Sequence, residues 1–276
     1  MDNFQLLDKL IDLALEEDLQ KNGDITSEPI FTHHHFTYKL ISKDNGVLCG
    51  IEIFTRVFHM VDNQTHVVSY FEDGASIGKG DLIAEISGKV VSILKSERTA
   101  LNFLSMLSAV ATRTSAFVEE SRGLVTVLDT RKTIPGFRQL QKYAVRCGGG
   151  SNHRMGLYDM VMIKDNHIDA AGGIKAAVGI IRDQWGERYK IEVETRNIGE
   201  VREALACGVD RIMLDNMSDI ETMEAVRLIN GKCETEASGN MTLGRIRKVA
   251  TTGVNFISIG EITHSIKAFD FSLKVK

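Results

Sequence analysis

The sequence predicts an α/β protein in two parts, a mixed helix-and-strand region up to about residue 112 and an α/β barrel after it. After Gly123, six short apolar runs end in polar residues and alternate with helical patterns. Buried parallel strands joined by helical crossovers have this pattern. Before that point, turn signals such as Gly78-Lys79-Gly80-Asp81 separate short apolar runs, which indicates a small sheet. The length of 276 residues suits one large or two modest domains.

The first part starts with an amphipathic pattern over residues 6–18, to which Met1 also belongs, and this pattern predicts a helix. A second helix is expected over residues 51–61. A long third helix is expected over residues 96–120, with Ser96 as its N-cap and Gly123 as its stop. Strands are expected at residues 38–42, 47–49, 66–70, 82–86 and 90–94.

The second part contains the barrel strands, expected at residues 125–128, 160–163, 191–193, 211–214, 234–237 and 256–259. Six units are fewer than the usual eight, so we expect an incomplete barrel with its functional groups at the carboxyl ends of the strands. The last residues, 269–276, alternate apolar and polar side chains and are expected to return to the first sheet. The predicted domains are therefore 1–112, joined by 269–276, and 113–268.

The charge distribution is uneven. The chain has a net charge of -4, which argues against a nucleic-acid-binding surface. The stretch from Arg131 to Lys164 nevertheless holds seven cations against one acid, Asp159. A positive focus in an acidic chain indicates a small polyanionic ligand. The seven cations are Arg131, Lys132, Arg138, Lys142, Arg146, Arg154 and Lys164.

Several other classes of protein or site are disfavoured. No run of about 18 or more apolar residues is present, so no membrane span is expected, and residues 1–17 lack the layout of a secretory signal. The four cysteines lie far apart without a C-x-x-C pair. This spacing favours small buried thiols in a reducing cytosol over a zinc ribbon or a redox dithiol. The run from His33 to His35 lacks the spacing of a metal site.

Basic side chains recur at the ends of the predicted strands. Thr130, Arg131 and Lys132 follow the first barrel strand, His153-Arg154 follows a glycine-rich turn, and Lys164 follows the next strand. Arginine offers a planar fork for carboxylate or phosphate, and lysine a compact charge. A substrate with two ring carboxylates would use both. The alternative, solvated surface charge, is weakened by the repetition at successive strand ends.

Two carboxylates, Glu194 and Asp215, each close an apolar strand. In a positive cavity such acids suit ribose hydroxyls or a Mg²⁺ ion that bridges phosphates. The alternative is a structural ion pair with Arg131 or Lys164. Glu192 lies in the same segment and is expected on the opposite face of the sheet.

The late loops predict a phosphate site. Ser238-Gly239-Asn240 precedes Thr242, a suitable N-cap for the helix through residues 246–250, and Gly260 opens the next loop near His264. Glycine lets backbone amides approach an anion, and a helix N-terminus adds partial positive charge. Barrels commonly hold phosphate at these late strand loops.

Together these segments resemble the quinolinate phosphoribosyltransferases, also called nicotinate-nucleotide pyrophosphorylases (carboxylating). The resemblance covers nearly the whole chain, and its central part, residues 128–167, is highly specific. It is carried by Ser96–Asn102, Leu128–Gly136, Gln141–Val145, Gly148–Arg154, Ile163–His167, Glu192–Glu194, Met213–Met217, Glu236–Asn240 and Ser258–Gly260.

The resemblance implies an α/β-sandwich N-terminal domain, an open α/β barrel and at least a homodimer, with a higher oligomer built from dimers as a further expectation. It implies that Lys132, Lys164, Glu194 and Asp215 are catalytic. It further implies that Arg98 enters the neighbouring subunit's site, and that Glu194 and Asp215 bind ribose and Mg²⁺. The residues implied to hold quinolinate are Arg131, His153, Arg154 and Lys164, and those implied to line the 5′-phosphate are Ser238, Gly239, Asn240 and Gly260. Asn240 stands where many relatives have glycine.

The activity implied is phosphoribosyl transfer from phosphoribosyl pyrophosphate to quinolinate with loss of carbon dioxide, in the cytoplasm, with no nucleic-acid or membrane partner. Three alternatives stay open at this stage. One is a barrel transferase or decarboxylase for another phosphorylated or heteroaromatic acid, and one is a non-catalytic ligand-binding protein. A related molybdenum-associated family shares the Arg-Lys-Thr-x-Pro-Gly segment but tends to lack the Lys-Asp-Asn-His run present at 164–167.

Overall fold

The computed structural model describes residues 6–276, so Met1 of the first predicted helix lies outside the described part. The chain divides into two compact units, each of which is described by itself. The first unit contains residues up to Ser115 together with Ile134–Gly149 and Ile266–Lys276, and the second contains Ala116–Thr133 and Gly150–Ser265. The prediction from sequence placed 134–149 in the barrel domain, whereas in the structure these residues cluster with the first unit. The backbone at Gly148 approaches the long helix of the first unit so closely that a Cβ there would lie 2.3 Å from Ala111 O.

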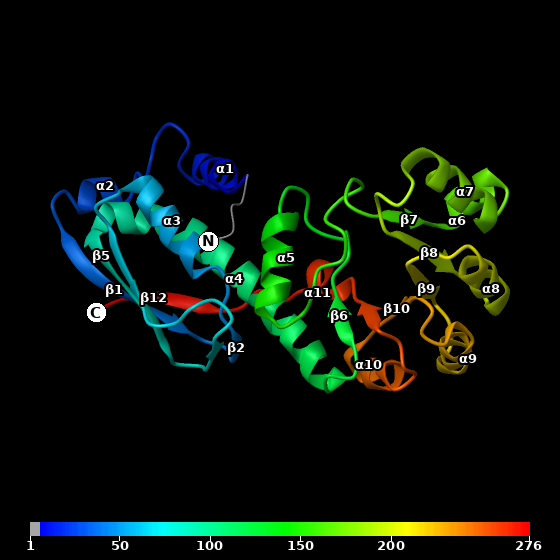
Figure 1. Cartoon of the computed structure of the whole chain (residues 1–276). Coiled ribbons are helices and arrows are strands. Elements are labelled where there is room, and N and C mark those ends of the chain that lie inside the picture. The colour runs from blue at the N-terminus through cyan, green and yellow to red at the C-terminus, as the bar shows by residue number, and fades with distance from the viewer. Residues whose placement is uncertain (1–5) are drawn as a thin grey trace. The chain divides into compact units, whose positions relative to one another are not determined.

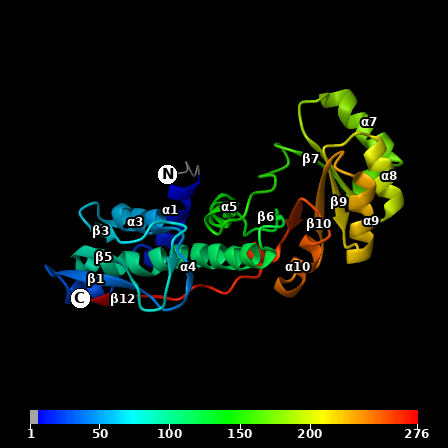
Figure 2. The same ribbon diagram turned by 60° about the horizontal axis from the view of Figure 1, so that its bottom comes forward.

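The first unit is a four-stranded antiparallel sheet, in the order β12-β1-β5-β3, with helices packed against it (Figures 1 and 2). The last strand pairs with the first, Tyr38 opposite Val275, so the C-terminal segment lies in this sheet. Phe54 and Phe58 are fully buried in the core of this unit. The elements are α1 (Leu7–Leu19), α2 (Ser27–Ile30), β1 (His35–Ser42), β2 (Gly46–Val47), α3 (Ile51–Val61), β3 (His66–Ser69), β4 (Ser76–Ile77), β5 (Leu82–Lys89), α5 (Arg138–Cys147) and β12 (Phe271–Val275).

The long helix α4 (Val90–Ser121) runs from the first unit into the second. It starts at Val90, so the predicted strand over residues 90–94 is wrong, and Ser96 lies inside the helix instead of capping it. The Ser96 hydroxyl donates to Ser92 O at 2.8 Å, a bond within the helix. Val90 and Ile93 are both fully buried. A short apolar run at this spacing is compatible with a buried helix as well as with a strand, and periodicity alone does not separate the two.

The second unit is an open parallel sheet of six strands, in the order β6-β11-β10-β9-β8-β7, with helices along its outside (Figure 1). This arrangement confirms the predicted α/β class. Each predicted barrel strand is present to within about two residues. The elements are β6 (Thr126–Leu128), β7 (Val161–Ile163), α6 (Asp165–Ala171), α7 (Ile174–Trp185), β8 (Ile191–Thr195), α8 (Ile198–Ala206), β9 (Arg211–Asp215), α9 (Asp219–Ile229), β10 (Glu234–Ser238), α10 (Leu243–Ala250), β11 (Phe256–Ser258) and α11 (Glu261–His264).

Side chains in the centre of this sheet are apolar and have almost no exposed surface, as in Val193, Ile212 and Ile257. Parallel strands are covered on both faces, which explains why their sequences read as apolar runs. Glu192 in β8 and Glu236 in β10 are exceptions, because both are fully buried acids within strands. Among residues 6–276, no helix is both long and apolar enough to span a membrane.

Candidate active site

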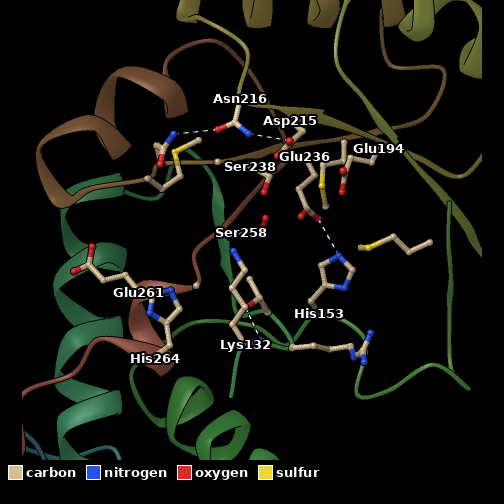
Figure 3. A pocket seen from close by; sticks show the side chains of 18 of the residues that line it. Lys132, His153, Glu194, Asp215, Asn216, Glu236, Ser238, Ser258, Glu261 and His264 are labelled. Carbon is tan, nitrogen blue, oxygen red and sulfur yellow. Dashed lines mark hydrogen bonds and ion pairs between the residues drawn. The ribbon is translucent and has the colours of Figure 1, made fainter. Parts of the chain in front are cut away.

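A cavity of about 990 Å³ lies at the carboxyl ends of the six parallel strands, and all its lining residues belong to the second unit (Figure 3). Every site residue predicted from the sequence except Arg98 lines it. These residues are Thr130, Arg131, Lys132, His153, Arg154, Lys164, Glu194, Asp215, Ser238, Gly239, Asn240, Gly260 and His264. Distant segments of the chain thus converge because parallel strands end at one edge of the sheet.

Arg98 belongs to the first unit, on α4, where it lines a separate cavity of about 310 Å³ with Thr99, Asn102 and Phe103. Phe103 stacks on Phe137 in the same wall, with ring centroids 5.5 Å apart. The role expected for Arg98 concerns a second subunit, and it stays a prediction.

The seven cations between Arg131 and Lys164 lie in two different units of the structure. Arg131, Lys132, Arg154 and Lys164 line the cavity. The other three members, Arg138, Lys142 and Arg146, lie on α5 in the first unit, and Lys142 is fully buried there. The positive focus at the cavity therefore comes from four side chains on three strand-end loops.

Asp129, which is fully buried directly after β6, anchors the loop that carries Arg154. Its Oδ1 accepts the backbone N–H of His153 at 2.9 Å, and its Oδ2 accepts the Asn152 amide at 2.6 Å. On the neighbouring loop, Lys132 N donates to Thr130 Oγ1 at 3.0 Å. A buried carboxylate that accepts several hydrogen bonds holds a loop firmly, so Asp129 fixes the backbone of the loop that carries Arg154.

Arg154 is half-buried and donates from Nη1 to Met160 O at 3.2 Å. Burial, together with the positive charge of Arg131, lowers the pKa of its guanidinium. Two cations that repel each other in a partly desolvated cavity gain when an anion binds between them. The arrangement therefore favours a ligand that carries more than one negative charge.

Beneath these cations lies a buried polar network that the sequence analysis missed. His153 Nε2 is 3.3 Å from Glu236 Oε2 (Figure 3). It is also 3.0 Å from Glu192 Oε2, and both glutamates are fully buried. Arg211 Nη1 pairs with the same Glu236 oxygen at 3.1 Å and lies over the Phe256 ring. The expectation that Glu192 points away from Glu194 was wrong, because residues two apart on a strand share a face.

The protonation of this network follows from its hydrogen bonds. The backbone N–H of Arg154 donates to His153 Nδ1 at 2.7 Å, so the ring carries its proton on Nε2, between the two carboxylates. A metal ion at Nε2 would displace that proton, and Nδ1 is not free to take it because it faces the Arg154 N–H, so the geometry disfavours this trio as a metal centre.

Burial and hydrogen bonding act in opposite directions on the pKa values of this network. Burial opposes charge on His153, but the contacts of Nε2 with the accepting carboxylates of Glu192 and Glu236 outweigh it and raise the pKa of His153 to about 9. Burial and the charge of Glu236 also raise the pKa of Glu192. The Arg154 N–H faces Nδ1, so the geometry favours the neutral ring with its proton on Nε2 over the doubly protonated ring that the raised pKa alone would favour. In Glu236, burial is outweighed by His153 and Arg211, which lower the pKa of this carboxyl and keep it ionised.

The two acids predicted from strand ends lie on adjacent strands, Glu194 on β8 and Asp215 at the end of β9. Glu194 forms an ion pair with Lys164, as the structural alternative required, yet both side chains also line the cavity. Asp215 Oδ2 accepts the Asn216 amide at 2.8 Å. Carboxylate oxygens of this kind are the ligands that Mg²⁺ prefers, usually beside substrate phosphates.

The loop after β10 has the backbone shape expected of an anion cradle. Gly239 and Asn240 have φ values of +92° and +47°. A Cβ on Gly239 would lie 2.1 Å from Asn216 Oδ1, and the Asn240 amide donates to the same oxygen at 3.2 Å. Thr242 is the N-cap residue of α10, as predicted. Asn216, which joins this loop to Asp215, was not singled out in the sequence.

Models of one known protein family match most of this chain. The model of the "Quinolinate phosphoribosyl transferase, C-terminal domain" matches residues 110–274, and that of the N-terminal domain matches residues 24–108. The chain belongs to the quinolinate phosphoribosyl transferase family. It is 44% identical over 290 aligned residues to "Quinolinate phosphoribosyltransferase [decarboxylating] 1b" of Nicotiana tabacum, covering 96% of this chain and 81% of the tobacco protein.

Bacterial relatives are similar over almost their full length. The "Probable nicotinate-nucleotide pyrophosphorylase [carboxylating]" of Bacillus subtilis is 40% identical over 99% of this chain and 94% of its own. Among solved structures, NadC from Streptococcus pyogenes matches with a TM-score of 0.95 and 41% identity, covering 100% of this chain and 99% of that one. Membership of the family therefore extends to both units of this chain.

Proposed function

We propose that this chain transfers the phosphoribosyl group of phosphoribosyl pyrophosphate to quinolinate with loss of carbon dioxide. The products are nicotinate mononucleotide and pyrophosphate, in the de novo route to NAD. One observation carries the proposal: four cations, two strand-end acids and a glycine-containing cradle line a single cavity. The family membership supports the same reaction, because relatives similar over nearly all of this chain have names that state it.

Each group of side chains has a part in this reaction. Arg131, Arg154 and Lys164 bind the two carboxylates of quinolinate, because guanidinium and ammonium groups suit a dianion. His153 has protein partners at both ring nitrogens, so it acts through its position beneath the substrate. Lys132 lies beside the pyrophosphate, and the loop from Ser238 to Asn240 holds the 5′-phosphate.

The chemical step needs no nucleophile from the protein. The ring nitrogen of quinolinate attacks the anomeric carbon of ribose as pyrophosphate leaves. The positive nitrogen then stabilises the electron pair left on ring carbon 2 when the 2-carboxylate departs as carbon dioxide, and this carbon takes up a proton from water to give the product. The cavity contributes by holding both substrates in line and by placing fixed positive charge near the departing groups. Glu194 and Asp215 would hold a Mg²⁺ ion, which would supply further charge stabilisation for the departing pyrophosphate.

The direct test incubates the purified protein with quinolinate, phosphoribosyl pyrophosphate and Mg²⁺, and measures carbon dioxide and mononucleotide together. We expect both products in equal amounts. Nicotinate, which lacks the second carboxylate, should be a very poor substrate and separates this activity from that of other barrel transferases. Mononucleotide formed from nicotinate as readily as from quinolinate, or no product from either, would contradict the proposal.

Removal of divalent metal is expected to abolish turnover. EDTA should stop mononucleotide formation, and added Mg²⁺ should restore it. Glu194→Gln, which keeps the shape of the side chain but weakens its binding to a cation, should raise the Mg²⁺ concentration needed for half-maximal rate by about tenfold. The control is Glu224→Gln, at an exposed position on α9. Equal Mg²⁺ requirements in both variants would count against Glu194 as a ligand.

Gly239→Ala is expected to weaken binding of phosphoribosyl pyrophosphate. The new Cβ would meet Asn216 Oδ1 at 2.1 Å, and the φ of +92° disfavours any side chain. We expect KM for this substrate to rise at least tenfold, with a smaller change for quinolinate. Gly244→Ala, on α10 with no atom within 4 Å of the added Cβ, is the matched control. Similar KM values in the two variants would show that the loop is not the phosphate cradle.

We further propose that the protein is a cytoplasmic homodimer in which Arg98 completes the partner's site. Arg98→Ala and Lys164→Ala should each be nearly inactive alone. Mixing the two proteins should restore part of the activity, because some hybrid dimers contain one site with both residues intact. Native mass spectrometry would verify that subunits have exchanged. No recovery after verified exchange would disprove a shared site.

A further inference from the structure

Two cysteines in the first unit lie close together although the sequence separates them widely. The Sγ atoms of Cys49, before α3, and Cys147, at the end of α5, lie within 4.8 Å of each other and of an Asp73 carboxylate oxygen. Both are free thiols. Spacing in the sequence predicted no dithiol, because it does not reveal a contact between distant segments. The prediction that all four thiols are buried was also wrong, since only Cys49 is buried.

The backbone on both sides of this pair is fixed by α4. Cys49 N donates to Ser108 Oγ at 3.0 Å, and the Ser108 hydroxyl contacts Cys49 O at 3.2 Å. On the other side, Gly148 lies against α4, where a Cβ would be 2.3 Å from Ala111 O and 2.7 Å from Thr114 Cβ. Ser108 and Ala111 are one turn apart on the same helix. The thiols therefore face each other from a shared, rigid support.

Asp73 lies beside the two thiols, and both oxygens of its carboxylate already accept hydrogen bonds. Its Oδ1 accepts the N–H groups of Gly50 and Ile51 at 2.8 and 3.0 Å, and its Oδ2 accepts the Tyr143 hydroxyl at 2.7 Å. A metal ion bound here would have to displace these hydrogen bonds, and among the described residues the group offers two thiols as its other ligands. The geometry thus favours reaction between the two sulfur atoms over metal binding.

The two thiols differ in reactivity. Cys147 is half-buried, and its contact with the Cys49 thiol lowers its pKa despite partial burial. Cys49 is fully buried, and burial raises its pKa well above the usual value. The thiolate is the form that reacts with oxidants. Cys147 is therefore the sulfur that reacts first, and Cys49 is the neighbour that follows.

We propose that Cys49 and Cys147 form a reversible disulfide when the protein meets a hydroperoxide. The Cys147 thiolate attacks one peroxide oxygen, the O–O bond breaks, and Cys147 becomes a sulfenic acid while the second oxygen leaves as hydroxide. The Cys49 sulfur then attacks Cys147 Sγ, the S–O bond breaks, and the oxygen leaves as water with the proton of the Cys49 thiol. The two electrons lost by the sulfur pair reduce the peroxide to water.

The test treats the purified full-length protein with one equivalent of hydrogen peroxide and counts thiols under denaturing conditions. Two of the four thiols should be lost with a mass decrease of about 2 Da, one per hydrogen removed, and dithiothreitol should restore both. Peptide mapping should find Cys49 linked to Cys147. Oxidation at Cys207 or Cys233 ahead of this pair would overturn the proposal, as would Cys147 oxidised without a link to Cys49.

Two variants test the assigned roles without a substitution at the buried Cys49. Cys207→Ala with Cys233→Ala keeps only the pair, and it should lose both remaining thiols at the wild-type rate. Cys147→Ser leaves Cys49 as a fully buried thiol, so Cys49 should remain reduced under the same treatment. A disulfide that fails to form in the double variant, or rapid oxidation of Cys49 in Cys147→Ser, would each contradict the assigned roles.

Discussion

Replacement of Arg154 by alanine is expected to lower kcat/KM for quinolinate by about 30- to 1,000-fold, which corresponds to roughly 2–4 kcal/mol. Arg154 lines the cavity, half-buried, and its guanidinium is held by Met160 O. A carboxylate bound there would lose a charge-assisted partner in a partly desolvated place, where such a partner is worth most. KM for phosphoribosyl pyrophosphate should change much less, because the phosphate cradle is on other strands.

Two further variants separate charge from geometry at this position. Arg154→Lys keeps the charge but loses the planar fork, so it should recover only part of the lost kcat/KM. Arg196→Ala removes an arginine of the same unit that pairs with Glu200 on the exposed side of α8 and does not line the cavity. It should behave as the unmodified protein. A wild-type kcat/KM for Arg154→Ala would remove Arg154 from the substrate site.

The cavity could be predicted from the sequence because its residues follow buried strands. Apolar runs such as Met160–Ile163 reveal the strand, and the first polar residue after such a run is then expected at the active edge. Lys164, Glu194 and Asp215 were found at strand ends in this way, and all line the cavity. The prediction needed only local sequence and the rule that parallel strands end at one edge.

The parts that sequence did not predict depend on distant contacts. Glu236 lies in a strand with Glu234 and Thr235, where it reads as ordinary polar sequence. Its burial follows from His153 and Arg211, which come from other loops and strands. The helix α5 was assigned to the barrel because it lies between two barrel segments in the chain, but it packs against α4 in the first unit. Cys49 and Cys147 were missed for the same reason.

Glu236→Ala is expected to destabilise the second unit by about 3 kcal/mol, a large change for one side chain. The substitution leaves Arg211, only 14% exposed, without its fully buried partner, and it leaves His153 Nε2 with Glu192 alone. Burial raises the pKa of Glu192 most and the charge of Glu236 adds to this, so this pKa should fall in the variant.

Glu234→Ala is the matched control for this prediction. Glu234 pairs with the same arginine at 2.9 Å, but its side chain is 40% exposed, whereas that of Glu236 has no exposed surface. An exposed pair contributes little, so this variant should lose less than about 1 kcal/mol. Urea unfolding of the three proteins measures the difference. Equal midpoints for the two variants would mean that the buried network does not stabilise the sheet, and that Glu236 is held there for binding alone.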